Sequence, residues 1–127
     1  MSTPVSIAIV GASGYTGEEL VRICVRHPGM EVAAVTSRQL KGKTLLETLA
    51  VGGAAGAIRF EDLSAAEVAK KAEVVFLALP HGVSAEIGNE LRAAGKRVFD
   101  LSADFRLKDA KVYEKTYGAV HPAPARL

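Results

Sequence analysis

Short apolar runs separated by amphipathic stretches dominate the first hundred residues of the chain. The runs Ile7–Val10, Val32–Val35 and Val74–Leu79, and a shorter one at Val98 and Phe99, are apolar at consecutive positions. Such runs are typical of strands that are covered on both faces, as in a parallel sheet, whereas half-buried strands alternate. Each run therefore predicts a buried strand.

The stretches between the runs have helical spacing. The first helix is predicted from Tyr15 to His27, before Pro28 and Gly29 end it. Its apolar stripe consists of Leu20, Val21, Cys24 and Val25. Ser64 and Glu67 have capping-box spacing ahead of a second, short helix. A third helix, closed by Gly95, carries the apolar repeat Val83, Ile87, Leu91 and Ala94.

Strand and helix alternate from residue 6 to about residue 100, which predicts one α/β domain over residues 1–127 with a right-handed, doubly wound parallel sheet. The segment Lys41 to Gly56 has four glycines and no clear period, so we expect a loop with a weak helix there. Residues 101–127 follow another pattern. We expect a loop, a short helix through Tyr113 and Tyr117, and a tail directed toward a further domain.

Composition excludes several function classes. The formal net charge is +2 and the basic residues are scattered, which is unlike a nucleic-acid-binding surface. A single cysteine, Cys24, allows no internal disulfide or cysteine-rich metal cluster, and its place on the helix stripe predicts a buried thiol. His27 and His121 lack metal-ligand spacing. Without a signal sequence or a spanning apolar stretch, we expect a cytoplasmic protein with no metal, membrane or nucleic-acid partner.

A glycine-rich turn follows the first predicted strand and leads into the first helix, the context in which such turns bind phosphate groups. Gly11 would permit the tight turn, Gly14 the close approach of a diphosphate, and Gly17 the packing of helix on strand. Ser13 and Thr16 could add hydroxyl donors. The turn predicts a dinucleotide site; the alternative is a turn that serves only helix packing.

The end of the second predicted strand distinguishes the two nicotinamide cofactors. NAD-binding proteins usually place an acidic residue here, on the ribose hydroxyls, but this chain has Thr36, Ser37, Arg38 and Gln39. A hydroxyl and a guanidinium suit a 2'-phosphate, which favours NADP. In the alternative interpretation, Arg38 is an ordinary solvated loop residue.

Two further segments follow predicted strands at the same sheet edge. In the first, Pro80 and Gly82 would shape a turn near the nicotinamide, and His81 has a structural or cofactor-contact role or transfers a proton. In the second, Ser102 and Arg106 are candidates for contact with the substrate. Arg106 either holds a substrate anion or forms an ion pair with a nearby aspartate that orders the loop.

These motifs together resemble the N-acetyl-gamma-glutamyl-phosphate reductase family of arginine biosynthesis. The matching segments, in order, are Gly11–Gly17, Thr36–Arg38, Leu79–Gly82, Asp100–Leu107 and His121–Pro124. The resemblance covers essentially the whole chain and implies a Rossmann-like fold and an NADPH-dependent reduction of an acyl phosphate through a cysteine thioester. It also implies that the complete enzyme is a homo-oligomer.

The same resemblance implies residue roles. Ser13, Gly14, Tyr15 and Thr16 would hold the cofactor diphosphate, Ser37 and Arg38 its 2'-phosphate, and Arg106 would help to receive the substrate. The family's nucleophilic cysteine and catalytic histidine lie beyond residue 127, in and after an Asn-Pro-Gly-Cys-type motif. We therefore expect no catalytic residue in this chain, a chain that is inactive alone, and exposed apolar surface.

Other classes remain open. An aspartate-semialdehyde dehydrogenase shares the architecture and chemistry, and a close relative could act on a carrier-bound amino-adipyl phosphate. A short-chain reductase is disfavoured, because Tyr15, Tyr113 and Tyr117 each lack a lysine four residues on. From a different class, the chain could be a non-catalytic NADP-binding module.

Overall fold

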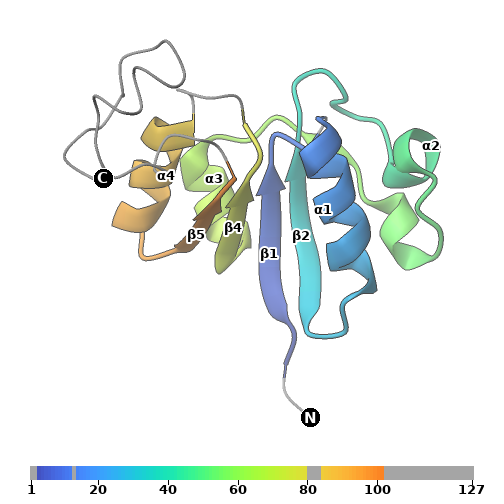
Figure 1. Ribbon diagram of the computed structural model, residues 1–127, viewed down its shortest axis with the longest axis horizontal. Coiled ribbons are helices and arrows are strands. Elements are labelled where there is room, and N and C mark those ends of the chain that lie inside the picture. The colour runs from blue at the N-terminus through green and yellow to red at the C-terminus, as the bar shows by residue number, and fades with distance from the viewer. Residues whose placement is uncertain (1–2, 13, 80–83, 102–127) are drawn as a thin grey trace.

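The computed structural model describes residues 3–12, 14–79 and 84–101. In this part of the chain, five parallel strands form one sheet in the order β3-β2-β1-β4-β5 (Figure 1). The strands are β1 (Val5–Val10), β2 (Met30–Thr36), β3 (Phe60–Glu61), β4 (Val74–Leu77) and β5 (Arg97–Asp100). The helices are α1 (Tyr15–Arg26), α2 (Leu45–Leu49), the 3-10 helix η1 (Ala54–Ala57), α3 (Ala65–Lys71) and α4 (Ser84–Ala93).

The strand order reverses beside β1, the first strand in the sequence. The chain steps outward through β2 and β3, then crosses to the other side of β1 and continues through β4 and β5. This arrangement is a doubly wound sheet, so the predicted α/β fold class is confirmed. In such sheets ligands bind at the carboxyl ends of the strands where the order reverses, here the ends of β1 and β4.

Helices on opposite faces of the sheet enclose two apolar cores. α1 and α2 cover one face and α3 and α4 the other, as Figure 1 shows. The first core is built by Ile7, Ile9, Val21, Cys24, Val35, Leu45 and Phe60, among others. The second includes Ala8, Val10, Ala34, Val68, Val75, Leu77 and Leu91. Consecutive residues of β1 thus enter different cores, which explains why its sequence is apolar without alternation.

β4 and β5 differ from β1 in their burial. Val74 and Phe76 are half-buried, and Phe99 is 52% exposed, although it stacks on Phe76 with ring centroids 5.3 Å apart. These side chains lie on the face of the sheet that α1 covers, but α1 packs mainly over β1 and β2. Among the described elements, the expectation that every strand is covered on both faces holds only in part for β4 and β5: Val74 and Phe76 pack against the first core but stay half-buried, and Phe99 is exposed.

Most predicted boundaries agree with the structure. α1 spans Tyr15–Arg26, with His27 as its C-cap, and α3 begins with the expected capping box of Ser64 and Glu67. β4 ends at Leu77, two residues before the predicted end of its apolar run. The two-residue strand β3 was not predicted, and neither was the capping box that Thr44 forms at the start of α2.

Several predictions lie outside the described residues. They concern Ser13, Pro80, His81, Gly82, Ser102, Arg106 and His121, and the helix through Tyr113 and Tyr117. Among the residues that are described, no helix has the length and apolar character needed to cross a membrane.

Candidate functional site

The described parts of the segments singled out in the sequence lie along one edge of the sheet. Hydrogen bonds continue the strand pairing past the ends of the strands: Ala12 N donates to Thr36 O at 2.9 Å, and Ala78 N donates to Val10 O at 2.9 Å. On the outer side, Ser37 N donates to Glu61 O at 3.1 Å. The glycine turn, the loop after β2 and the exit of β4 are therefore held next to one another at the carboxyl edge (Figure 1).

Gly11 makes the turn from β1 toward α1 in a conformation that requires glycine. Its φ angle is +79°, and a Cβ atom there would lie 2.7 Å from Leu79 Cδ2 and 2.9 Å from Ala78 O. The Gly11 N–H donates to Thr36 Oγ1 at 3.2 Å, and Thr36 is buried. The turn is thus fixed to both neighbouring strands, to β4 by close packing and to β2 by a hydrogen bond.

The other two glycines of the motif have opposite surroundings. A Cβ at Gly17 would lie 2.7 Å from Ala12 Cα, 2.9 Å from Ala12 C and 2.9 Å from Gly11 O, so α1 packs there directly on the turn. A Cβ at Gly14, the N-cap of α1, would meet nothing within 4 Å. The space at Gly14 is open, while the space at Gly17 is filled by backbone.

The start of α1 has the properties of an anion site. Gly14 has no side chain to cap the helix, so it does not occupy the N–H groups of the first turn, which have no acceptor within the helix. The side chains of Tyr15 and Thr16, in that turn, are exposed. The partial positive charge of the helix end and these N–H groups favour an anion in the open space beside Gly14.

The loop after β2 carries Ser37 and Arg38. Ser37 is 6% exposed and its Oγ accepts a hydrogen bond from Leu40 N at 3.2 Å, which holds the loop in a turn. The Arg38 side chain is 90% exposed, and its Nε lies 3.8 Å from Asp62 Oδ1. The hydroxyl is therefore fixed by the backbone, while the guanidinium is held only loosely by one carboxylate.

The contacts of three residues at this edge of the sheet were not identified from the sequence. Thr36 was considered only as part of a motif, but its hydroxyl accepts the hydrogen bond of the glycine turn. Asp62 faces Arg38 because β3 pairs with β2, and a strand of two residues leaves no periodic signal. Ser84, at the start of α4, donates from Oγ to the Asp100 carboxylate, with 3.0 and 3.1 Å to its two oxygens. That contact ties α4 to the end of β5.

Cys24 lies on the buried stripe of α1, as predicted. It is 1% exposed, and burial raises the pKa of its thiol above the ordinary range. Nucleophilic cysteines instead have lowered pKa values and accessible sulfur atoms. Cys24 is therefore a structural residue of the first core.

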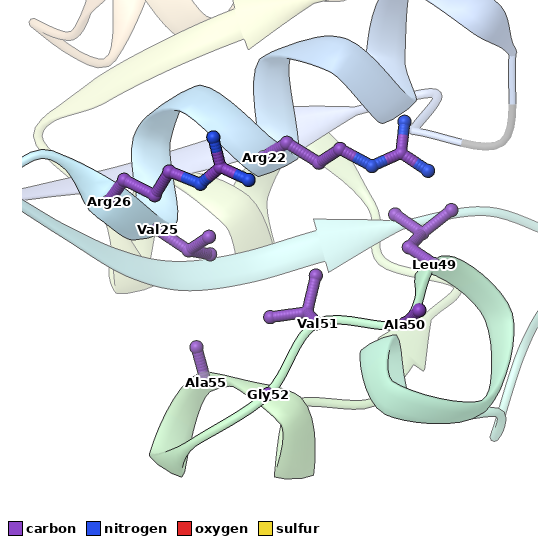
Figure 2. Close-up of a pocket in the computed structure, with 8 residues that line it drawn as sticks. All are labelled: Arg22, Val25, Arg26, Leu49, Ala50, Val51, Gly52 and Ala55. Atoms are coloured by element: carbon purple, nitrogen blue, oxygen red, sulfur yellow. The ribbon is translucent and has the colours of Figure 1, made fainter.

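The described residues also line a shallow cavity of about 220 Å³ away from the sheet edge. Figure 2 shows Arg22 and Arg26 extending from α1 along one side of it and Val51 on the other. None of the predicted cofactor or substrate residues lines this cavity. Within the described ranges, no three His, Cys, Asp or Glu side chains are grouped so that they could hold a metal ion.

Comparison with known proteins shows a match over nearly the whole chain. Residues 6–122 match the family described as "Semialdehyde dehydrogenase, NAD binding domain". The N-acetyl-gamma-glutamyl-phosphate reductase of Methylacidiphilum infernorum is 46% identical over 119 residues, which are 93% of this chain and 34% of that protein. The [LysW]-L-2-aminoadipate/[LysW]-L-glutamate phosphate reductase of Saccharolobus solfataricus is 44% identical over 126 residues, which are 98% of this chain and 35% of that protein.

Solved structures agree with the fold. Aspartate semialdehyde dehydrogenase from Candida albicans, crystallised with NADP, superimposes with a TM-score of 0.69 at 18% identity, over 94% of this chain and 41% of that chain. At this identity the likeness concerns the fold alone. The chain spans about a third of the length of the curated relatives that it matches.

Proposed function

Because the chain belongs to the semialdehyde dehydrogenase family through its NAD-binding domain, we propose that it binds NADPH and serves as the cofactor-binding part of an N-acetyl-gamma-glutamyl-phosphate reductase. The observation that carries this proposal is the identity of 46% over 93% of the chain with a relative of that name. The proposed reaction is the reduction of an acyl phosphate to an aldehyde in arginine biosynthesis.

The residues at the carboxyl edge fit the cofactor. A dinucleotide needs room for its diphosphate beside a helix N-terminus, and the open space at Gly14 meets that need. In the proposed mode of binding, N–H groups of the first turn of α1 and the hydroxyls of Ser13 and Thr16 contact the diphosphate. Ser37 and Arg38 hold the 2'-phosphate, the group that distinguishes NADPH from NADH.

NADPH supplies the hydride when bound, and the chain's own residues bind and orient it. We propose that Pro80, His81 and Gly82 lie near the nicotinamide end, since they follow β4 at the same sheet edge as the glycine turn. Ser102 and Arg106 would contact the substrate, with the Arg106 guanidinium on its phosphate.

The nucleophile of a thioester route must come from outside these 127 residues. Cys24 is the single cysteine of the sequence, and it is buried with a raised pKa. A thiol in that state neither reaches a substrate nor ionises readily.

A second candidate substrate has support from the comparisons. The relative from Saccharolobus solfataricus, at 44% identity, is named for substrates attached to a carrier protein, LysW. Both candidates are acyl phosphates, and the cofactor site that we propose serves either. The two candidates are distinguished by comparing the activity of an enzyme that contains this chain on N-acetyl-gamma-glutamyl phosphate with its activity on a LysW-bound amino-adipyl phosphate.

The proposed cofactor site is tested by calorimetric titration of the 127-residue chain with NADPH and with NADH at fixed salt. We expect saturable binding that favours NADPH and that weakens about tenfold or more in Arg38→Ala, because a guanidinium–phosphate contact is lost. Lys41→Ala, which removes an exposed charge three residues along the same loop, is the matched control and should change the affinity by less than about threefold.

Two results would contradict the proposal. Absence of binding to either cofactor by a chain with a folded circular dichroism spectrum would exclude a working dinucleotide site. Binding of NADPH that is equally affected by Arg38→Ala and Lys41→Ala would show that only general electrostatic attraction acts at this edge.

A further inference from the structure

The short strand β3 brings an acidic residue to the loop that carries Arg38. β3 pairs with the end of β2 so that Thr36 lies opposite Glu61, and Ser37 N donates to Glu61 O at 3.1 Å. The residue that follows β3, Asp62, therefore leaves the sheet beside the loop of Ser37 and Arg38. The separation of 3.8 Å between Arg38 Nε and Asp62 Oδ1 reflects this register.

Asp62 is available to a ligand in a way that its neighbour Glu61 is not. The Lys71 ammonium group donates to both carboxylate oxygens of Glu61, at 3.1 and 3.3 Å, so Glu61 already has a close cationic partner. The contact of Asp62 with Arg38 is longer, and the Asp62 side chain is 47% exposed. Exposed pairs of this kind are worth little and are easily rearranged.

The two charged side chains have opposite preferences for the ribose of a dinucleotide. A guanidinium attracts a 2'-phosphate, which carries up to two negative charges, and a neighbouring carboxylate repels it. A free 2'-hydroxyl instead needs an acceptor, and a carboxylate is the acceptor that NAD-binding sites commonly use. In this chain the nearby carboxylate is not at the end of β2, where such an acid is usually found, but on Asp62, the residue after the neighbouring strand β3.

We propose that Asp62 is a second specificity-determining residue for the cofactor, and that it opposes Arg38. The Asp62 carboxylate accepts a hydrogen bond from the ribose 2'-hydroxyl of NADH and disfavours the 2'-phosphate of NADPH. The site consequently discriminates less between the two cofactors than Arg38 alone would allow. This inference rests on the proposed function, because it requires the adenosine ribose to lie at Arg38.

The test is calorimetric titration of Asp62→Asn with NADPH and with NADH at fixed salt, beside the unchanged chain. The asparagine keeps the size of the side chain and removes its charge. We expect the dissociation constant for NADPH to fall about threefold and that for NADH to rise about threefold, so that their ratio moves by about tenfold toward NADPH.

Two matched variants separate this role from general charge effects. Asp62→Glu keeps the carboxylate and should leave the ratio within about twofold of the unchanged chain. Glu61→Gln removes the adjacent carboxylate that Lys71 contacts, and it should also leave the ratio unchanged. Thermal unfolding of each variant checks that the fold is retained.

The outcomes distinguish this inference from the proposed function. If NADPH binds and Arg38→Ala weakens it, but Asp62→Asn leaves the ratio unchanged, only the inference is overturned. A loss of NADPH affinity in Asp62→Asn would also overturn it, by showing that the carboxylate instead orients Arg38 for the phosphate. If neither cofactor binds the unchanged chain, the proposed cofactor site and this inference both fail.

Discussion

Gly14 and Gly17 lie three residues apart in one motif, yet alanine at the two positions should have opposite consequences. At Gly17 the new Cβ would lie within 2.9 Å of three backbone atoms of the turn, and backbone cannot move aside without shifting α1. At Gly14 the new Cβ would meet nothing within 4 Å. The first substitution therefore acts on the fold, and the second acts on whatever occupies the open space.

The magnitudes follow from these surroundings. Overpacking costs about 1–3 kcal/mol, and contacts with backbone fall at the upper end, while alanine gains roughly 0.5–1 kcal/mol over glycine within a helix. Gly17→Ala should thus lower the free energy of unfolding by about 2 kcal/mol. At Gly14, which has φ −80° and ψ 168°, alanine reduces the freedom of the unfolded chain by about 0.4–1 kcal/mol but is a poorer N-cap. The net change in unfolding free energy should stay within about 0.5 kcal/mol.

The assay combines urea unfolding, followed by circular dichroism, with titration by NADPH. Gly17→Ala should move the unfolding midpoint down by about 1 M urea. Gly14→Ala should keep the midpoint and weaken NADPH binding by about tenfold or more, since its methyl group would occupy the space proposed for the diphosphate. Gly52→Ala, at a glycine that also has open space around it and lies outside the motif, is the control and should change neither quantity.

Two results would refute this reasoning. If Gly14→Ala unfolds as readily as Gly17→Ala, the space beside Gly14 is not open in solution. If Gly14→Ala keeps both its stability and its NADPH affinity, the diphosphate does not approach Gly14, and the glycine motif serves only the packing of α1.

The remaining predictions concern single contacts. Thr36→Val leaves the Gly11 N–H without its acceptor and should lower the free energy of unfolding, measured by urea titration, by about 1–3 kcal/mol. Thr36→Ser keeps a hydroxyl and should retain most of the stability of the unchanged chain. Ser64→Ala removes the cap of α3 and should cost about 1 kcal/mol in the same assay, with Ser64→Asp as the variant that preserves the cap. The raised pKa of the Cys24 thiol means that the unfolded chain ionises first, so stability should fall as the pH rises above the ordinary thiol pKa, and Cys24→Ala should flatten that alkaline decline.

The parts of the fold that were predictable are those fixed by local sequence. β1 is apolar at consecutive positions because both of its faces are covered, and α1 has an apolar stripe that ends where Pro28 and Gly29 follow. β3 could not be found in this way. It has two residues, Phe60 and Glu61, and it exists because its backbone pairs with the end of β2, which no periodic pattern within β3 records.

The same distinction applies to the candidate site. The positive φ of Gly11 and the packing of Gly17 on Ala12 are local to the turn, so the type of residue already indicates them. The pairing of Arg38 with Asp62 joins residues 24 positions apart in sequence and depends on the register of two strands. The partial exposure of β4 and β5 likewise depends on which helices pack on the face of the sheet that carries Phe76 and Phe99. An apolar run in the sequence does not show which helices will cover the strand.

The end of β2 explains how the two halves of the proposed cofactor site keep a fixed distance. Thr36 accepts hydrogen bonds from both Gly11 N, through its side chain, and Ala12 N, through its carbonyl oxygen, so the glycine turn cannot shift along β2. The next residue, Ser37, is buried and holds the following turn through Leu40 N. The proposed diphosphate and ribose positions are thus spaced by backbone, whereas the charges at the proposed ribose position are carried by exposed side chains. If the proposed site is right, preference for one nicotinamide cofactor can therefore change by substitution at residues 38 and 62 without disturbing the turn proposed to bind the diphosphate common to both.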